Sequence, residues 1–157
     1  MTAAPAVTVR LGSPLDLRAV AQIEQRSFSD AWSLEALYGE LCPDNLRLPL
    51  VAELEDEVCG YLMAWRVVDQ LHILNIAADP QIRRRGIGSA LLVAAAREAS
   101  ASGLRELTLE VRRSNQAARA FYRGHGLSET GLRPGYYTDT GEDAIIMAGP
   151  VAGIGGE

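Results

Sequence analysis

The sequence predicts a single domain of mixed α/β class, and three observations support this fold class. β-rich runs and amphipathic segments alternate along all 157 residues. No repeat, low-complexity tract or internal linker separates them. Two of the β-rich runs are joined by a short acidic turn, which is typical of an antiparallel hairpin. We therefore expect one domain over residues 1–149, followed by a flexible tail of small residues over 150–157.

The N-terminal half is expected to pack a β-meander against helices. Ser13, Pro14 and Asp16 have the residue types of an N-cap, a first helical position and an acidic N3, so a helix should begin there. Ser33 is expected to cap a second, short helix, and Glu55–Glu57 forms the hairpin turn. The expected elements are a strand at 7–10, helices at 14–27 and after 33, and strands at 46–54, 58–68 and 71–77.

The C-terminal half is expected to alternate between helix and strand. A helix should begin at Gly86 and end at Gly103, with one apolar face toward the core. Ser114 is expected to cap a further helix that ends near Gly126. The remaining expectations are core positions Ile87, Leu91, Leu92 and Ala95 on the first helix, and strands at 104–111, 127–132 and 144–147.

The composition is ordinary for a soluble globular protein, with 48% hydrophobic and 22% charged residues. The net charge of −5 argues against general nucleic-acid binding and suits a basic partner better. No stretch is apolar and long enough to cross a bilayer, and the N-terminus lacks the regions of a signal peptide, so we expect a cytoplasmic protein. Cys42 and Cys59 have no metal-ligand spacing, so free thiols and no metal are expected.

The segment Arg83-Arg84-Arg85-Gly86-Ile87-Gly88-Ser89 is the most informative local pattern. It lies between an apolar strand and an apolar helix, and its two glycines leave the backbone N–H groups uncovered. N–H groups at the positive end of a helix dipole, beside arginine side chains, form a cradle for a pyrophosphate group. A solvated basic helix start is the alternative for this motif taken alone.

Several further segments resemble, in order along the chain, the GNAT superfamily of acetyltransferases and, within it, the RimI family of ribosomal-protein-alanine N-acetyltransferases. The segments that carry the resemblance are Ile23–Phe28, Trp32–Ser33, Asn75–Ala77, Asp79–Pro80, Arg83–Gly88, Leu109–Arg112, Ser114–Asn115, Ala120–Tyr122, Tyr136–Tyr137 and Gly141–Ala144. The resemblance implies a mostly antiparallel mixed sheet of about seven strands, splayed at a V-shaped cleft and flanked by about four helices. It also implies acetyl-CoA as the co-substrate.

Glu110 is the candidate general base for attack of an amine on the thioester of acetyl-CoA. It alternates with Leu109 and Val111 on a predicted strand, so its carboxylate should lie on the opposite face of the sheet. A partly desolvated carboxylate there could accept a proton directly or through water. An exposed strand glutamate is the alternative, and the resemblance favours the catalytic role.

Tyr122 is the candidate general acid for the departing thiolate. It follows Phe121 on a predicted helix, so the two rings should point in different directions. A tyrosine is protonated at neutral pH, because its reference pKa is about 10. A core tyrosine is the alternative, and the resemblance favours the acid. Asn115, at the start of the same helix, could bind the pantetheine or phosphate portion or simply begin the helix.

The backbone of Ile76 and Ala77 is implied by the resemblance to bind the cofactor. In the resembled fold their strand splays from the Glu110 strand at a bulge and frees N–H groups for the pantetheine and the thioester oxygen. The two histidines, His72 and His125, are expected to have structural or exposed roles. Neither cysteine has a basic partner in sequence, so direct transfer in a ternary complex is favoured over an acyl-cysteine route.

The acceptor side is expected to contain Trp32, Glu35, Tyr136 and Tyr137, as an aromatic and acidic mouth for a short basic N-terminal peptide. A surface hairpin with a solvated acidic turn is the alternative. A protein α-amine has a reference pKa of about 7.7 to 8.0 against about 10.4 for lysine, so a lone glutamate suffices more easily for the α-amine.

The sequence therefore predicts an acetyltransferase that modifies a protein N-terminus. By resemblance, the acceptor is the N-terminal alanine of a small-subunit ribosomal protein, and the enzyme is a monomer or weak dimer. Acetylation of lysines, polyamines or antibiotic amines is a second possibility, and a non-catalytic CoA-binding module is a third. A dinucleotide-binding site is excluded, because the chain lacks a third glycine at the required spacing.

Overall fold

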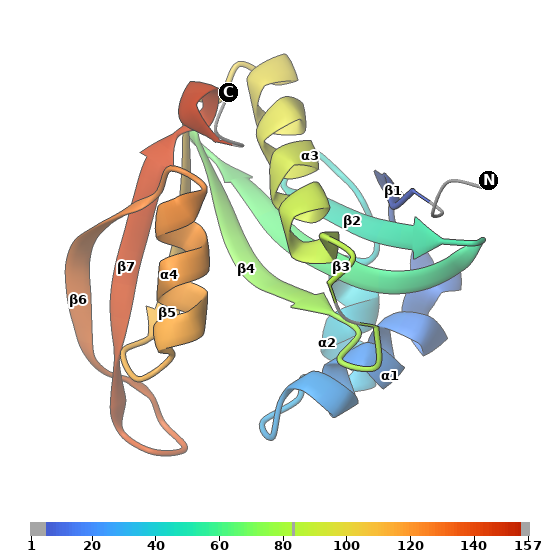
Figure 1. Ribbon diagram of the computed structural model, residues 1–157, viewed down its shortest axis with the longest axis horizontal. Helices are drawn as coiled ribbons and strands as arrows, with labels where there is room; N and C mark the ends of the chain where they lie inside the picture. The colour runs from blue at the N-terminus through green and yellow to red at the C-terminus, as the bar shows by residue number, and fades with distance from the viewer. Residues whose placement is uncertain (1–5, 83, 155–157) are drawn as a thin grey trace.

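The computed structural model describes residues 6–82 and 84–154. Within these residues the chain forms one seven-stranded sheet with the strand order β1-β2-β3-β4-β5-β7-β6, four α-helices and two short 3₁₀ helices (Figure 1). The strands are β1 (Thr8–Leu11), β2 (Arg47–Leu54), β3 (Glu57–Val67), β4 (Gln70–Ala78), β5 (Glu106–Arg112), β6 (Ser128–Tyr137) and β7 (Glu142–Pro150). The helices are η1 (Pro14–Asp16), α1 (Leu17–Ser27), α2 (Leu34–Glu40), α3 (Ile87–Ala101), α4 (Gln116–Gly124) and η2 (Val151–Gly153). The mixed α/β class is confirmed.

The sheet is antiparallel except at one place, and there it splits. β4 and β5 are parallel neighbours, but they pair only from Gln70 to Ile73 on β4. Leu74 is an extra residue in the β3–β4 register, which passes from Ile73 directly to Asn75. Such a bulge bends its strand, so the second half of β4 diverges from β5. β5 pairs instead with β7 along its whole length, and a V-shaped gap opens between the two halves of the sheet (Figure 1).

Helices cover both faces of the sheet and make two cores. α3 and α4 lie on one face, where Ile87, Leu91, Leu92 and Ala95 are buried as predicted. α1 and α2 lie on the opposite face and bury a smaller cluster (Figure 1). Burial of apolar area on both faces stabilises the fold by about 25 cal/mol per Å², and it holds the two diverging strands at a fixed angle.

The helix ends follow the predicted capping residues with one exception. Ser13 and Asp16 form a reciprocal capping box, and the Ser33 hydroxyl accepts a hydrogen bond from Ala36 N–H. The cap of α4 is Asn115, whose Oδ1 accepts from Ala118 N–H at 3.0 Å, rather than the expected Ser114. The longer asparagine side chain reaches the third N–H, whereas Ser114 donates its own N–H to Glu142.

The C-terminal segment differs from the expected tail over residues 150–154. β7 continues to Pro150, and η2 follows it. Val151 and Ile154 are buried against the α3 core, because the 3₁₀ turn places residues three apart on one side. Residues 155–157 lie outside the described part of the chain. Both cysteines are free, Cys59 being buried and Cys42 partly exposed. None of the described helices has the length and apolar character needed to span a bilayer.

Candidate active site

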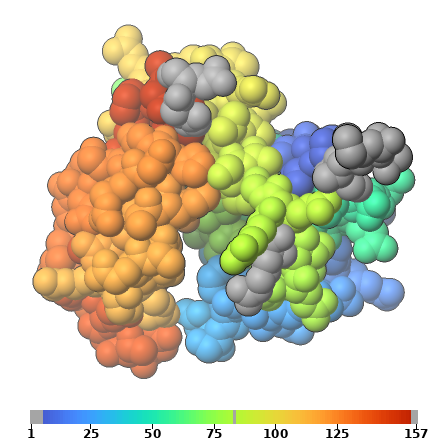
Figure 2. All heavy atoms as spheres, in the orientation of Figure 1, coloured from blue at the N-terminus to red at the C-terminus, as the bar shows by residue number. Residues whose placement is uncertain are grey.

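The gap between β4 and β5 is a cleft lined by both polar and apolar residues. Figure 2 shows the surface hollowed along this line, between α4 with β6–β7 and the loop that precedes α3. One wall comes from α1, the α1–α2 loop and β4, and the other from β5, α4 and the end of β6. The lining residues are Glu24, Phe28, Asp30, Trp32, Ile73, Leu74, Asn75, Ile76, Leu109, Glu110, Val111, Arg112, Asn115, Ala118, Tyr122 and Tyr137.

Glu110 faces this cleft from β5, on the sheet face opposite the buried Leu109, as predicted. Its carboxylate lies beside His72 of β4, whose Nε2 is 2.9 Å from one carboxylate oxygen and 3.1 Å from the other. Tyr136 approaches with its hydroxyl at 3.4 Å, and Arg133 Nε lies 3.9 Å away. The prediction that His72 is structural or exposed missed this contact.

These neighbours favour the ionised form of the Glu110 side chain. The hydrogen bond from His72 lowers the pKa of Glu110 below its usual value, while burial raises it. Electrostatic interactions with His72 and Arg133 and the hydroxyl of Tyr136 also lower this pKa. Glu110 is therefore ionised at neutral pH and can accept a proton or a hydrogen bond from an amine.

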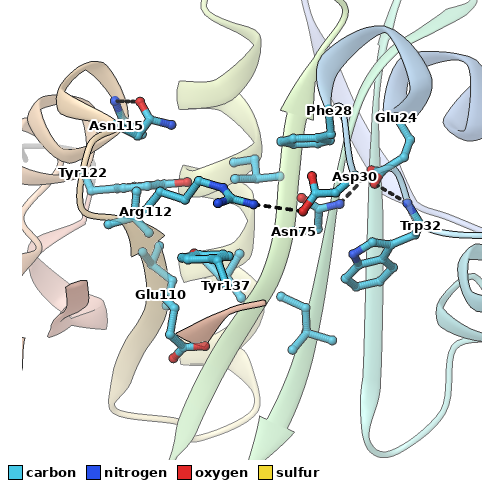
Figure 3. A pocket seen from close by; sticks show the side chains of 16 residues that line it. Glu24, Phe28, Asp30, Trp32, Asn75, Glu110, Arg112, Asn115, Tyr122 and Tyr137 are labelled. Atoms are coloured by element: carbon cyan, nitrogen blue, oxygen red, sulfur yellow. Dashed lines mark hydrogen bonds and ion pairs between the residues drawn. The ribbon is translucent and has the colours of Figure 1, made fainter. Parts of the chain in front are cut away.

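Tyr122 lies on α4 with its ring buried and its hydroxyl end in the cleft (Figure 3). Burial raises the pKa of the Tyr122 hydroxyl well above its usual value, so the phenol is protonated at neutral pH. Phe121 points elsewhere, toward α3, as the helix geometry predicts. Tyr122 and Glu110 thus reach the same cleft from different elements, one as a proton donor and one as an acceptor.

The start of α3 has the backbone geometry of an anion cradle. Gly86 is the N-cap residue with φ of +68°, and it provides no side-chain cap for the first turn. Arg84 also has a positive φ of 57°. The free N–H groups of this turn remain available to an anion, and Arg84 and Arg85 are exposed beside them. Arg83, the first residue of the predicted motif, lies outside the described residues.

Gly88 and Ser89 contact α4. A Cβ built on Gly88 would lie 3.2 Å from the Phe121 ring, so protein packing, and not only a ligand, requires glycine here. His125 Nδ1 lies 2.9 Å from the carbonyl of Phe121, and His125 Nε2 lies 2.9 Å from the Ser89 hydroxyl. Because a carbonyl can only accept, Nδ1 donates to Phe121, and Nε2 shares a hydrogen bond with the Ser89 hydroxyl. Helix α3 is therefore fastened to the helix that carries Tyr122.

The other predicted cofactor residues lie near the split. Ile76 lines the cleft, whereas Ala77 is buried in the α1–α2 core. β5 has no pairing with β4 beyond Ile73, so the edge of β4 that carries Ile76 faces the gap. Asn115 lines the opposite wall, where its oxygen caps α4.

Trp32 is fixed on the α1–α2 wall by a buried carboxylate that the sequence analysis did not assign. Glu24 is 1% exposed, and it accepts hydrogen bonds from Trp32 N–H at 2.9 Å and from Asn75 Nδ2 at 2.7 Å. The hydroxyl of Tyr61 donates to the same carboxylate. Three donors from three elements satisfy this buried acid, so the loop that carries Trp32 is tied to β3 and β4.

Arg112 joins the two walls of the cleft. Its guanidinium donates to Asp30 on the α1–α2 loop at 3.0 Å and to Asp139 on the β6–β7 hairpin at 2.9 Å. It also lies 4.1 Å from the centre of the Tyr137 ring, and Glu142 is 3.4 Å away. Figure 3 shows Arg112 reaching across the cleft to Asp30. The sequence placed Arg112 in a family motif but gave it no role.

The predicted acceptor residues are only partly brought together. Tyr137 lines the cleft and Tyr136 contacts Glu110, with the two rings edge to face at 5.0 Å. Burial raises the pKa of Tyr137 to about 12. Glu35 is exposed in the first turn of α2 and does not line the cleft, because that turn directs it away from the wall made by Trp32. The exposed acid of this wall is Asp30 instead.

Known proteins share both the sequence and the fold. The Acetyltransferase (GNAT) family matches residues 17–127. A [ribosomal protein bS18]-alanine N-acetyltransferase of Salmonella typhimurium is 40% identical over 92% of this chain and 98% of its own length. The crystal structure of the ribosomal-protein-S18-alanine N-acetyltransferase from Escherichia coli superposes with a TM-score of 0.84 at 35% identity, over 92% of this chain and 94% of that one.

A more distant structure has the same fold. Ard1 from Thermoplasma volcanium gives a TM-score of 0.83 at 28% identity and covers 92% of this chain and 97% of its own. The fold, the split between β4 and β5 and the family match over most of the chain agree with one another. The chain therefore belongs to the GNAT family of acetyltransferases and is an acetyl-CoA-dependent N-acetyltransferase.

Proposed function

We propose that this enzyme acetylates the N-terminal alanine of ribosomal protein bS18 by direct attack of the α-amine on acetyl-CoA. The observation that carries the proposal is that a carboxylate and a phenol, Glu110 and Tyr122, line one cleft. Relatives that are 37 to 40% identical, over most of their length and of this chain, have this activity in their names. With a ribosomal acceptor, we expect the enzyme to act in the cytoplasm, and the proposal includes a monomer or weak dimer.

Acetyl-CoA would bind along the split in the sheet. The first turn of α3, from Gly86 to Ser89, would hold the pyrophosphate with its free N–H groups, with Arg83, Arg84 and Arg85 adding positive charge. The backbone at Ile76 and Ala77 would hold the pantetheine arm, and Asn115 would contact it from α4. When bound, acetyl-CoA supplies the thioester that is attacked.

Glu110 is proposed as the base and Tyr122 as the acid. The ionised carboxylate takes a proton from the attacking amine, directly or through water, and the phenol gives its proton to the departing thiolate. Glu110 then releases its proton to solvent, and Tyr122 regains a proton from solvent. Both groups are thereby returned to their starting states. Both cysteines are free and neither lines the cleft, which supports direct transfer.

The proposed acceptor is an α-amine, because the base is weak. Glu110 has a pKa below the usual 4.5, whereas an α-amine titrates at about 7.7 to 8.0 and a lysine at about 10.4. At pH 7 roughly a tenth of α-amines are already neutral, but well under a thousandth of lysines are. Trp32, Tyr136 and Tyr137 would contact the first residues of the peptide, with Asp30 in the place expected for Glu35.

Turnover of acetyl-CoA on matched acceptors tests this function. We expect thiol release with a peptide that begins with alanine. The same peptide with a blocked N-terminus and one free lysine should react at least tenfold more slowly, and a small diamine should react no faster than that blocked peptide. Equal rates on the two peptides would rule out the N-terminal assignment. Acetyl-CoA binding without turnover on any acceptor would indicate a non-catalytic module.

A further inference from the structure

His72 has no role in the resemblance, yet it makes the closest polar contact to the proposed base. We propose that His72 is a positioning residue that acts through Glu110, keeping this carboxylate aimed at the cleft and in its proton-accepting form. The inference rests on the proposed function, because it assigns a second residue to the same chemistry.

The contact follows from the parallel register of β4 and β5. His72 is paired with Thr108, and Glu110 follows two residues later on the same face of the sheet. His72 Nε2 lies 2.9 Å and 3.1 Å from the two oxygens of Glu110. An ionised carboxylate only accepts hydrogen bonds, so Nε2 carries the proton and donates. One donor thus holds both oxygens close to the end of the paired stretch of the two strands.

Glu110 and His72 differ in their relation to the cleft. Glu110 lines the cleft with its side chain 10% exposed, whereas His72 is 27% exposed and does not line the cleft. The imidazole is therefore not part of the cleft lining and does not occupy the space that an acceptor amine needs. A side chain in this position supports its neighbour without touching the substrate.

Among the groups around Glu110, His72 has the strongest influence on the carboxylate. From β6, Arg133 lies 3.9 Å away and Tyr136 donates over 3.4 Å, and Tyr137 adds a weaker influence from the same strand. Among the influences on the pKa of Glu110, the hydrogen bond from His72 is the largest, and burial opposes it. Loss of this donor would leave a largely buried carboxylate whose desolvation favours the protonated form. A protonated carboxyl group cannot accept a proton from the amine.

The chain offers a matched control for the experiment. One pleat earlier on the same two strands, Gln70 Nε2 donates to Glu106 Oε1 at 2.8 Å. Both pairs join β4 to β5 through a side-chain donor and a carboxylate, but only the His72 pair reaches the cleft. Gln70→Leu therefore measures the cost of losing a side-chain bridge between the strands, and His72→Leu measures the same cost plus the effect on Glu110.

We expect His72→Leu to lower kcat on an alanine-initiated peptide at least tenfold with an unchanged KM for acetyl-CoA. Gln70→Leu should keep the parental kcat, although both variants lose similar thermal stability. His72→Gln, which retains an N–H donor, should recover most of the lost kcat. Parental kcat in His72→Leu would overturn the proposal, and so would a His72→Gln variant as slow as His72→Leu, because the imidazole itself would then be required.

A second readout does not depend on turnover. Carbon-detected NMR of Glu110 should give a carboxyl pKa below 4.5 in the parent, a higher value in His72→Leu and a near-parental value in His72→Gln. An unmoved pKa in His72→Leu contradicts the inference even if the parent is fully active. If the parent acetylates no amine while the titration shifts as expected, the proposed function fails and the support of Glu110 by His72 stands.

Discussion

The proposed cofactor side and acceptor side of the site are built in different ways. The cofactor side, residues 84–89, is one continuous segment whose geometry is local, with positive φ at Arg84 and Gly86 opening the first turn of α3. The acceptor side joins the α1–α2 loop, β5 and the β6–β7 hairpin through the side chain of Arg112. One side is therefore set by backbone conformation and the other by charged side chains that meet across the cleft.

This difference indicates where each side is vulnerable. Free backbone N–H groups survive most side-chain substitutions but are lost when a Cβ or a helix shift closes the turn. Ion pairs at the surface survive backbone adjustment but weaken with salt or with loss of one charge. Tyr122 and Glu110 lie between the two sides, and substitutions of these residues should lower turnover more than substitutions on either side.

The largest effect on turnover is expected from a substitution of Tyr122, which lies between the cofactor side and the acceptor side. Tyr122→Phe removes only the hydroxyl from a buried ring, so turnover should fall by roughly 10²-fold or more while binding of acetyl-CoA and of the acceptor is retained. Steady-state kinetics together with calorimetric titration of acetyl-CoA would measure this split. Near-parental turnover would mean that solvent protonates the thiolate and that Tyr122 has only a packing role in the wall of the cleft.

A similarly large effect is expected for Glu110→Gln on an alanine-initiated peptide at neutral pH. The pKa of Glu110 lies below 4.5, so the parental carboxylate stays ionised down to that range and the amine alone governs the rise of the rate toward pH 8. The variant should approach the parental rate as pH increases from 6 to 9, because solvent then deprotonates the amine. A loss that stays constant over this range would assign Glu110 to holding the amine instead of accepting its proton.

An intermediate effect is expected from closing the cofactor side. Gly88→Val places a branched side chain where even a Cβ is 3.2 Å from the Phe121 ring, so the ring or the start of α3 must shift. Acetyl-CoA affinity should fall at least tenfold in calorimetry. Gly124→Ala is the control, since nothing lies within 4 Å of the added Cβ, and it should keep the parental affinity. Undiminished binding in Gly88→Val would remove the basis for the cradle.

The smallest effect is expected on the acceptor side. Asp30→Asn breaks the contact that joins the two walls, whereas Asp139→Asn breaks a contact of the same Arg112 nitrogen within one wall. An exposed ion pair contributes about 0.2–1 kcal/mol, so the acceptor KM of Asp30→Asn should rise by roughly two- to fivefold, with acetyl-CoA affinity unchanged. Added salt should raise the parental KM toward this value. An equal rise of the acceptor KM in Asp139→Asn would show that the loss of a negative charge matters, and not the loss of the contact between the two walls.

Much of the fold was predictable from the sequence, because its signals are local. The caps at Ser13 and Ser33, the buried face of α3 and the strand alternation around Glu110 each depend on residues within one or two turns or pleats. The glycine-containing start of α3 is local for the same reason. The expectation for 150–154 was wrong, since whether a short apolar segment packs depends on space left elsewhere in the core.

The contacts of the site were decided only by the tertiary structure. His72 meets Glu110 across 38 positions of sequence, and Arg112 meets Asp30 across 82, through a strand register and loop positions that no local pattern specifies. The burial of Glu24 and the approach of Phe121 to Gly88 are of the same kind. The sequence by itself determined which elements form and which chemical groups they carry, because propensity, capping and periodicity act between neighbours. The distances between those groups were decided by how the sheet divides and how the helices pack on it.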